Sequence, residues 1–157
     1  MNVKYFDTFI CKFNAMKKAS ILFVLLANAI AGQAQEWKNN LNDAVREASA
    51  SGKNVLLFFS VTEHCHSCEK LNENVLESTE FLDYAKSNYI LVKQDFGADN
   101  LENMEENLLI VEKYNKDGFF PLVVIINKNA KIVGQIGAYK EETPAQYVAL
   151  LESIKRS

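Results

Sequence analysis

Hydrophobic residues along this chain recur at helical spacing in some segments and form short continuous runs in others, which predicts helices that alternate with buried strands. A first helical stripe predicts a helix that ends near Gly52, and its members are Trp37, Leu41, Ala44, Val45 and Ala48. Residues 54–61 then form an apolar run without polar alternation, which predicts a strand buried on both faces, as in a parallel sheet. A second helical stripe follows, formed by Leu71, Val75 and Leu76.

The middle of the chain repeats this alternation of helix and strand. Ser78 or Thr79 is suited to cap a short helix, whose apolar face contains Phe81, Leu82 and Ala85. Residues 89–95 predict a second strand. A longer helix is expected over residues 101–114, where the apolar positions are Leu101, Met104, Leu108, Val111 and Tyr114.

The last third of the chain predicts a hairpin followed by a helix. Pro121 opens an apolar run over residues 122–126, and a short polar turn separates this run from another over residues 131–136, so the two strands are expected to pair as a hairpin. Thr143 as cap and Pro144 at the first helical position start the final helix. Its apolar face is formed by Tyr147, Val148, Leu151 and Ile154.

This order of elements predicts an α/β fold with one central mixed sheet. Strands that are separated by helices imply right-handed crossovers and a parallel pair of strands. The C-terminal hairpin adds antiparallel strands, and the helices are expected to cover both faces of the sheet. An N-terminal helix precedes the first strand, and a helix follows the hairpin.

The N-terminal segment has a different pattern, which is typical of a secretory signal peptide. Four lysines and one aspartate precede an apolar run over residues 21–27, and small residues follow it. The run is shorter than the roughly 20 residues that a permanent spanning helix needs, which makes an uncleaved anchor the weaker alternative. We expect residues 1–34 to be a signal peptide, cleaved after Ala31 or Ala34, with Met16 as an alternative start and residues 35–157 as the mature domain.

Charge and cysteine content narrow the function classes for the 157-residue chain. Removing residues 1–34 would change the formal net charge from −3 to −6, so the mature domain has no basic footprint for nucleic acid and is poorly suited to anionic membranes. Cys11 lies in the expected signal peptide, which leaves Cys65 and Cys68 as the cysteines of the mature chain. Export would place this pair where disulfides form and persist.

The Cys65-His66-Ser67-Cys68 motif falls at the predicted junction of the first buried strand and the helix after it. Unpaired backbone N–H groups and the helix dipole at such a junction stabilise a thiolate, which is the reactive form of cysteine. His64 and His66 can add positive charge or hydrogen bonds. Cys68 lies one helical turn further on, where it can attack a mixed disulfide on Cys65, so the spacing supplies a nucleophile and a resolving thiol.

Other uses of the same residues stay open at this point. His64, Cys65, His66 and Cys68 are all ligand types for zinc or copper, but five consecutive residues cannot easily wrap four ligands around one ion. No other Cys or His exists in the mature chain, so two-coordinate Cu(I) on the dithiol is the metal alternative. A disulfide across so short a loop would be a weak structural staple. The two histidines either tune the thiol or simply cover the strand end and face solvent.

At these residues the sequence resembles the thioredoxin superfamily, and within it the exported domains related to the C-terminal domain of transmembrane thiol–disulfide interchange proteins. The matching stretches are residues 53–59, 65–70, 92–95, 120–124 and 137–138. The resemblance implies a thioredoxin fold and a protein-disulfide oxidoreductase that needs no cofactor. It also implies that Cys65 attacks, that Cys68 resolves, and that the two form a redox-active disulfide.

The resemblance further implies that Pro121 is cis and that the backbone of Phe120 pairs with an extended substrate. From the residues alone, Phe119 and Phe120 either pack in the core or, if Phe120 is exposed beside the thiols, form a hydrophobic docking groove.

Two departures from the family pattern concern the surroundings of the thiols. His64 stands where the family often has tryptophan, and Phe59 is matched to the buried acid of thioredoxins, which moves protons off the resolving thiol. Glu63 and Lys93 are the candidates to replace that acid in part.

We therefore expect a monomeric thiol–disulfide oxidoreductase of the periplasm or an equivalent compartment, which contributes to cell redox homeostasis and acts as a reductase rather than an oxidase. Its partners would be a disulfide-containing protein substrate and a redox partner that recycles the dithiol. The alternative is a non-enzymatic thioredoxin-fold binding module or a Cu(I) carrier that uses the same dithiol.

Overall fold

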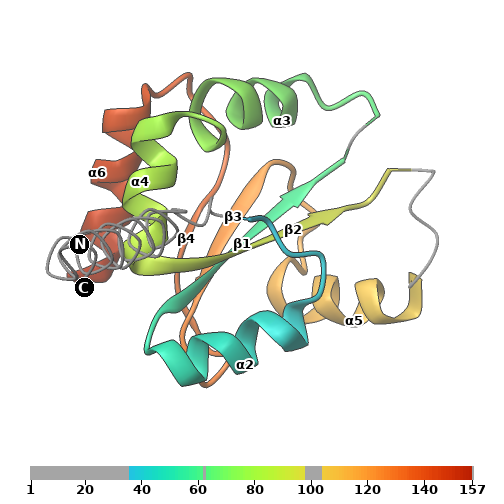
Figure 1. The fold of residues 1–157 in the computed structure, drawn as a ribbon. Coiled ribbons are helices and arrows are strands. Elements are labelled where there is room, and N and C mark those ends of the chain that lie inside the picture. The colour runs from blue at the N-terminus through green and yellow to red at the C-terminus, as the bar shows by residue number, and fades with distance from the viewer. Residues whose placement is uncertain (1–35, 62, 98–103, 157) are drawn as a thin grey trace, which may run out of the picture. The chain divides into compact units, whose positions relative to one another are not determined.

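The computed structural model describes residues 36–61, 63–97 and 104–156 (Figure 1). The expected signal peptide, residues 1–34, lies outside the described residues. Within the described part, none of the helices is both long and apolar enough to cross a membrane.

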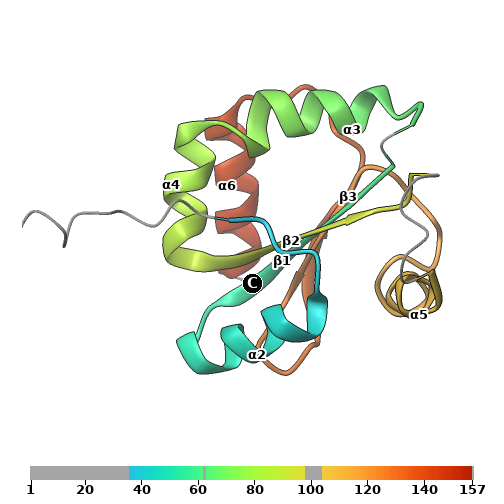
Figure 2. The same cartoon turned by 45° about the vertical axis from the view of Figure 1, so that its right-hand side comes forward.

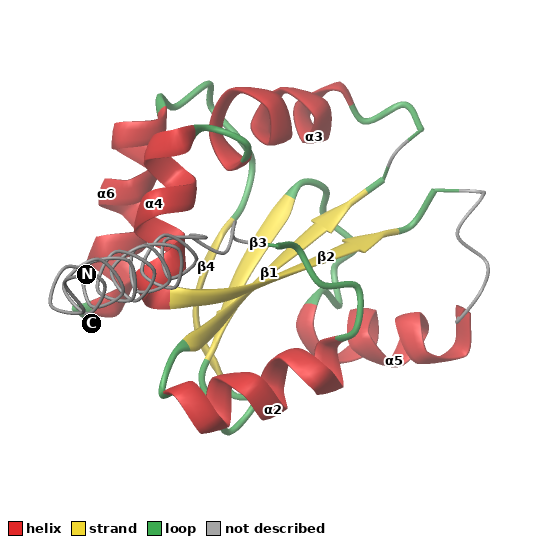
Figure 3. Cartoon of the chain, viewed as in Figure 1, coloured by secondary structure: helices red, strands yellow, loops and turns green. Residues whose placement is uncertain are grey.

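The centre of the fold is one mixed sheet, as predicted (Figure 3). Its strands are β1 (Asn54–Ser60), β2 (Tyr89–Asp95), β3 (Leu122–Ile126) and β4 (Ile132–Ile136), in the spatial order β2-β1-β3-β4. β1 and β2 are parallel, whereas β3 is antiparallel to both β1 and β4. β1 and β3 are almost fully buried because helices cover them on both faces, which explains why their sequences lack polar alternation.

Polar residues at the helix ends mark where most of the helices begin. α2 (Leu41–Ser51) begins after Asn40, whose side chain accepts the Asp43 N–H, and α4 (Thr79–Asn88) begins after Ser78, which caps Phe81. α3 (His66–Leu71) continues into a π-helical turn, η2 (Asn72–Leu76). α5 (Met104–Tyr114) has acidic residues in its first turn. α6 (Pro144–Lys155) starts with a reciprocal capping box between Thr143 and Gln146.

The helices lie in two layers on opposite faces of the sheet (Figure 2). α3, η2, α4 and α6 pack on one face, which we call the cysteine face because its buried cluster contains Cys68. α2 and α5 pack on the other, the α2/α5 face. This two-layer arrangement confirms the predicted fold class.

Trp37 corrects one detail of the prediction. It was assigned to the stripe of the first helix, but α2 begins only at Leu41. The backbone of the neighbouring Lys38 bonds to Leu91 and Lys93 beside β2, which holds this segment extended. The indole ring packs instead on the cysteine face, with its centroid 6.2 Å from Phe58 and 6.4 Å from Phe81.

Candidate functional site

The Cys65–Cys68 pair sits where the chain passes from β1 into α3, as the motif predicted. The two sulfurs are joined in a disulfide, with Cα atoms 5.2 Å apart. Cys65 is the N-cap residue of α3: its Sγ accepts the Cys68 N–H at 3.3 Å, and its carbonyl accepts the N–H groups of Cys68 and Glu69. The outer sulfur therefore lies against a backbone donor at the start of a helix, which favours negative charge there.

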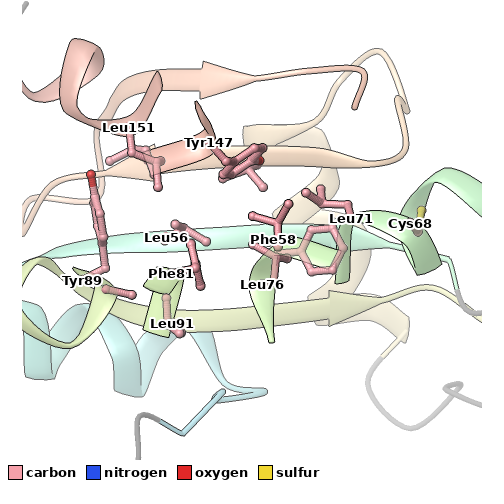
Figure 4. Close-up of a cluster of buried hydrophobic side chains, with 14 residues drawn as sticks. Leu56, Phe58, Cys68, Leu71, Leu76, Phe81, Tyr89, Leu91, Tyr147 and Leu151 are labelled. Atoms are coloured by element: carbon pink, nitrogen blue, oxygen red, sulfur yellow. The ribbon is translucent and has the colours of Figure 1, made fainter. Parts of the chain in front are cut away.

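The two sulfurs differ in exposure, which gives them different access to other molecules. Cys65 is half-buried, whereas Cys68 is 4% exposed and belongs to the apolar cluster of the cysteine face. Figure 4 shows Cys68 at one end of this cluster, beyond Leu71 and Phe58. A molecule that approaches the pair from solvent reaches Cys65 first.

The charged side chains next to the pair are exposed. His66 Nδ1 lies 3.7 Å from Glu69 Oε2, and Lys70 Nζ lies 2.7 Å from Glu141 Oε1. The hydrogen bond between Lys70 and Glu141 raises the pKa of the lysine and lowers the pKa of the carboxyl. Glu141 was not singled out from the sequence because it is 71 residues from Lys70 and comes close only in the folded chain.

His64 and Glu63 are both solvent-exposed, so neither is buried against the thiols. His64 has φ 65°, in the left-handed region that a residue with a Cβ seldom adopts, although histidine is among those enriched there. The structure thus fixes the backbone immediately before Cys65 in an uncommon conformation.

Lys93 lies on the cysteine face, beside Phe58 rather than Phe59, the position matched to the family's buried acid. Phe58, not Phe59, is paired in register with Lys93, and Lys93 Nζ lies 5.9 Å from the centroid of the Phe58 ring. Alternation along the strand turns Phe59 to the α2/α5 face. Phe58 is therefore the residue of this pair that lies on the same face as Lys93 and Cys68.

Phe120 and Pro121 lie beside the pair through the pairing of β3 with β1. Leu122 is opposite Phe59 at the end of β1, so the residues just before β3 stand next to the loop that carries the cysteines. The Phe120–Pro121 peptide bond is cis. Phe120 packs against both core clusters, including the one that holds the cysteines, and lies 5.8 Å from the Phe96 ring.

The two phenylalanines have different environments, a distinction that the sequence left open. Phe120 is partly buried and packs against both core clusters, but Phe119 is 64% exposed. Asn115, a residue that sequence reasoning missed, is 3% exposed and bonds with both backbone groups of Phe119. Its position just after a helix gave no signal beyond an ordinary helix end.

Among the described residues, no cluster of three or more His, Cys, Asp and Glu side chains is arranged to hold a metal ion. The arrangement of the site suits sulfur chemistry, because an accessible sulfur lies at a helix start, a shielded sulfur lies one turn away, and the cis Phe120–Pro121 bond precedes the neighbouring strand.

Comparison with known proteins gives consistent results. The family model described as thioredoxin-like matches residues 36–128. A protein named disulfide bond reductase DsbH, from Chlamydia pneumoniae, is 26% identical over 142 residues, which cover 88% of this chain and 84% of that protein. The solved structure of a DsbH oxidoreductase aligns with a TM-score of 0.70 at 26% identity, over 80% of this chain and 87% of the other.

The oxidised C-terminal domain of DsbD from Neisseria meningitidis aligns with a TM-score of 0.53 at 13% identity, over 75% of this chain and 98% of that domain. At this identity the likeness concerns the fold alone.

Proposed function

The chain belongs to the thioredoxin-like family, and from that premise we propose that it reduces disulfide bonds of proteins in the cell envelope through Cys65 and Cys68. The observation that carries the proposal is the bonded pair itself, with an accessible sulfur at a helix start and a buried sulfur one turn later. The likeness to proteins named as a disulfide bond reductase and as an oxidoreductase supports the same chemistry.

The reaction begins with the pair reduced. The Cys65 thiolate attacks one sulfur of the substrate disulfide, a mixed disulfide forms, and the other substrate sulfur leaves as a thiolate that takes a proton from solvent. Cys68 then loses its proton and attacks the Cys65 sulfur. The second substrate sulfur leaves, and the Cys65–Cys68 disulfide forms. Two electrons have passed to the substrate, and a dithiol redox partner must return two to the pair.

The surroundings of the pair set what each residue does in these steps. The Cys68 N–H donated to the Cys65 sulfur stabilises a thiolate there, which suits Cys65 as the attacking group. Burial of Cys68 protects the resolving thiol from other oxidants until the mixed disulfide forms beside it. We assign thiol tuning to His64, His66, Glu63 and Lys93, and substrate contact to Phe120 and Pro121.

Two influences oppose each other in deciding whether the pair reduces or oxidises its substrate. A stabilised thiolate favours the reduced form and makes the pair more oxidising, whereas the likeness to a disulfide bond reductase supports reduction. We assign the reductase direction. Equilibration of Cys65/Cys68 with glutathione buffers tests it, since a reductant like thioredoxin has a potential of about −270 mV and a strong oxidant like DsbA about −120 mV.

The decisive activity test is insulin reduction with dithiothreitol as the recycling reductant. Wild type should accelerate precipitation of the insulin B chain, Cys65→Ser should abolish the acceleration, and Cys68→Ser should accumulate a mixed disulfide through Cys65. Absence of turnover in wild type, together with tight Cu(I) binding that needs both cysteines, would instead establish the copper-carrier alternative.

Export and oligomeric state are parts of the same proposal. We propose that residues 1–34 direct export to the periplasm or the exterior and that the mature protein is a monomer. N-terminal sequencing of protein recovered from the envelope fraction should begin at Gly32 or Gln35. A chain that keeps its N-terminus and stays with the membrane would contradict cleavage, and light scattering checks the mass.

A further inference from the structure

Phe119 is an aromatic side chain that the fold leaves in solvent beside the site. Among the large hydrophobic side chains that the structure describes as exposed, it has the highest exposed fraction, 64%. A single exposed apolar residue is ordinary in itself. Phe119 differs because of where its backbone is held and what lies next to it.

The Asn115 side chain holds the Phe119 backbone in place through two hydrogen bonds. The buried Asn115 side chain donates through Nδ2 to the Phe119 carbonyl and accepts the Phe119 N–H at Oδ1, both at 3.0 Å. Its own backbone belongs to the end of α5, through a 2.8 Å bond to Val111, and accepts the N–H of Gly118. Gly118 has φ 65°, a conformation that glycine adopts without strain. The amide therefore ties the residue before Phe120 to a helix end through two directional bonds.

The next residues connect this fixed point to the reacting sulfurs. Phe120 follows directly, so its Cα lies about 3.8 Å or less from that of Phe119. Phe120 and Cys65 both pack against the cluster that contains Cys68, and Pro121 leads into β3 opposite the end of β1. Phe119 thus stands on the rim of the dithiol site, with its backbone held and its ring free to meet another molecule.

We infer that Phe119 is a specificity-determining side chain of the dithiol site and that Asn115 is its positioning residue. The pair selects polypeptide disulfides in which a large apolar side chain lies close to the reacting cysteine. This inference rests on the proposed function and names the substrate class for it. Lys116 and Asp117, the exposed neighbours, carry opposite charges, so the rim offers an apolar contact rather than a charge of one sign.

If the substrate binds as an extended chain, the preferred apolar side chain should lie at a defined distance from the attacked cysteine. Residues along an extended chain advance by about 3.3 Å, so a side chain two positions from the attacked cysteine lies about 7 Å along the strand and on the same face. Burying an aromatic contact of this kind changes binding by about five- to tenfold when it is well packed.

The experiment uses two synthetic peptides, each closed by one disulfide and identical except for Phe or Ser two positions from one cysteine. Steady-state reduction is measured with the full mature protein and dithiothreitol. Wild type should prefer the Phe peptide by about five- to tenfold in kcat/KM, mainly through KM. Phe119→Ala should bring this ratio close to one, and Phe119→Leu should keep most of it. Leu109→Ala, a matched control at a 62% exposed site on α5, should leave the ratio and the rates unchanged.

Asn115→Asp tests the positioning role, because aspartate keeps the acceptor for the Phe119 N–H but loses the donor to the Phe119 carbonyl. We expect KM for the Phe peptide to rise with kcat retained. A merely structural role would lower the folded fraction, and so kcat, for both peptides alike.

The possible outcomes distinguish failure of the Phe119 inference from failure of the proposed oxidoreductase function. If wild type reduces both peptides equally well, or if Phe119→Ala keeps the preference, the inference fails and the oxidoreductase function stands. If wild type reduces neither peptide, both fail. Because the readout is a ratio between two substrates, a general loss of activity in a variant does not imitate it.

Discussion

The two faces of the sheet share strands but differ in the side chains they bury. The α2/α5 face buries mainly aliphatic and aromatic residues, such as Leu57, Phe59 and Val124. Its buried polar side chain Gln94, in register with Phe59, donates a hydrogen bond to the Asn39 carbonyl. The cysteine face has a larger buried cluster that takes in Cys68. The cysteine pair is therefore joined to the core on one side of the sheet.

The cysteine face also contains buried hydroxyl groups that lack a hydrogen-bond partner among the described residues. Alternation along β1 puts Ser60 on the same face as Phe58, and Tyr147 belongs to the cysteine-face cluster. Both hydroxyl oxygens are buried and have no hydrogen-bond partner among the described residues. Burial raises the pKa of Tyr147, which keeps it neutral. In the part of the chain that the structure describes, the face that carries Cys68 therefore leaves more of its buried hydroxyl groups without a hydrogen bond than the α2/α5 face does.

Phe58→Ala and Phe59→Ala should give the largest effects, because these neighbours in β1 are fully buried on opposite faces. Each should lower the free energy of unfolding by about 3–5 kcal/mol, since truncating a buried phenylalanine leaves a cavity. Urea unfolding of each variant at neutral pH measures the loss.

The same pair of variants should separate the faces in their redox behaviour. Only Phe58→Ala opens space in the cluster that holds Cys68, where water would ease ionisation of the inner thiol and favour the reduced form. Its equilibrium with glutathione should move toward the dithiol, and that of Phe59→Ala should not. Equal shifts in both variants would show that the chemistry does not depend on one face.

Gly134→Ala should weaken the cysteine face at the far edge of the sheet. A Cβ at residue 134 would collide with the Cγ2 of Ile154 on α6 and lie 3.0 Å from its Cγ1. We expect a loss of about 1–3 kcal/mol in unfolding free energy from this overpacking. In an Ile154→Ala background the added cost should nearly vanish. A cost that persists there would assign the effect to the backbone of β4 rather than to the contact with α6.

Ser60→Ala should raise stability slightly. This result would support the conclusion that the cysteine face holds buried hydroxyl groups without hydrogen bonds. Removing a buried hydroxyl without a partner should add about 1 kcal/mol to the unfolding free energy. Urea titration of the disulfide form checks the sign. A decrease would mean that the hydroxyl bonds to a buried water in solution, and the contrast between the faces would then be smaller.

The Lys70–Glu141 pair should give the smallest effect because both groups are at the surface. Its hydrogen bond with Lys70 lowers the folded-state pKa of Glu141 below the ordinary value of 4.5. The pair thus stabilises the fold above the unfolded-state pKa, and this contribution is lost as pH falls through the folded-state pKa. Wild type should be slightly more stable than Lys70→Met at pH 7, and the gap should close once the pH falls below the folded-state pKa of Glu141. A gap that stays constant with pH would exclude Glu141 as the partner that matters.

Much of the fold follows from the sequence because its strands and caps are locally encoded. The runs over residues 89–95 and 122–126 match β2 and β3 at both ends, and Thr143-Pro144 marks the start of α6 correctly. Local signals are strong here because a fully buried strand admits few polar residues and a cap needs a particular side chain.

What the sequence could not supply were relations between distant residues. Asn115 looked like an ordinary residue after a helix, and its role follows only from its two bonds to Phe119 in the folded chain. Which of Phe58 and Phe59 faces the cysteines depends on the register with β2, which a count along the chain does not give. Trp37 was assigned to a helix because its spacing fitted, although backbone pairing beside β2 holds it elsewhere.

The pairing of β3 with β1 has a consequence for the order in which the site can form. The cysteine loop follows β1 and the proline edge precedes β3, and they meet through residues such as Phe59 and Leu122, far apart along the chain. Such contacts carry a loop-closure cost and tend to form late in folding. A nascent chain that has only paired β1 with β2 holds both thiols but does not yet place Phe120 and Pro121 beside them. The cysteine loop and the Phe120–Pro121 edge therefore come together only once β3 has paired with β1.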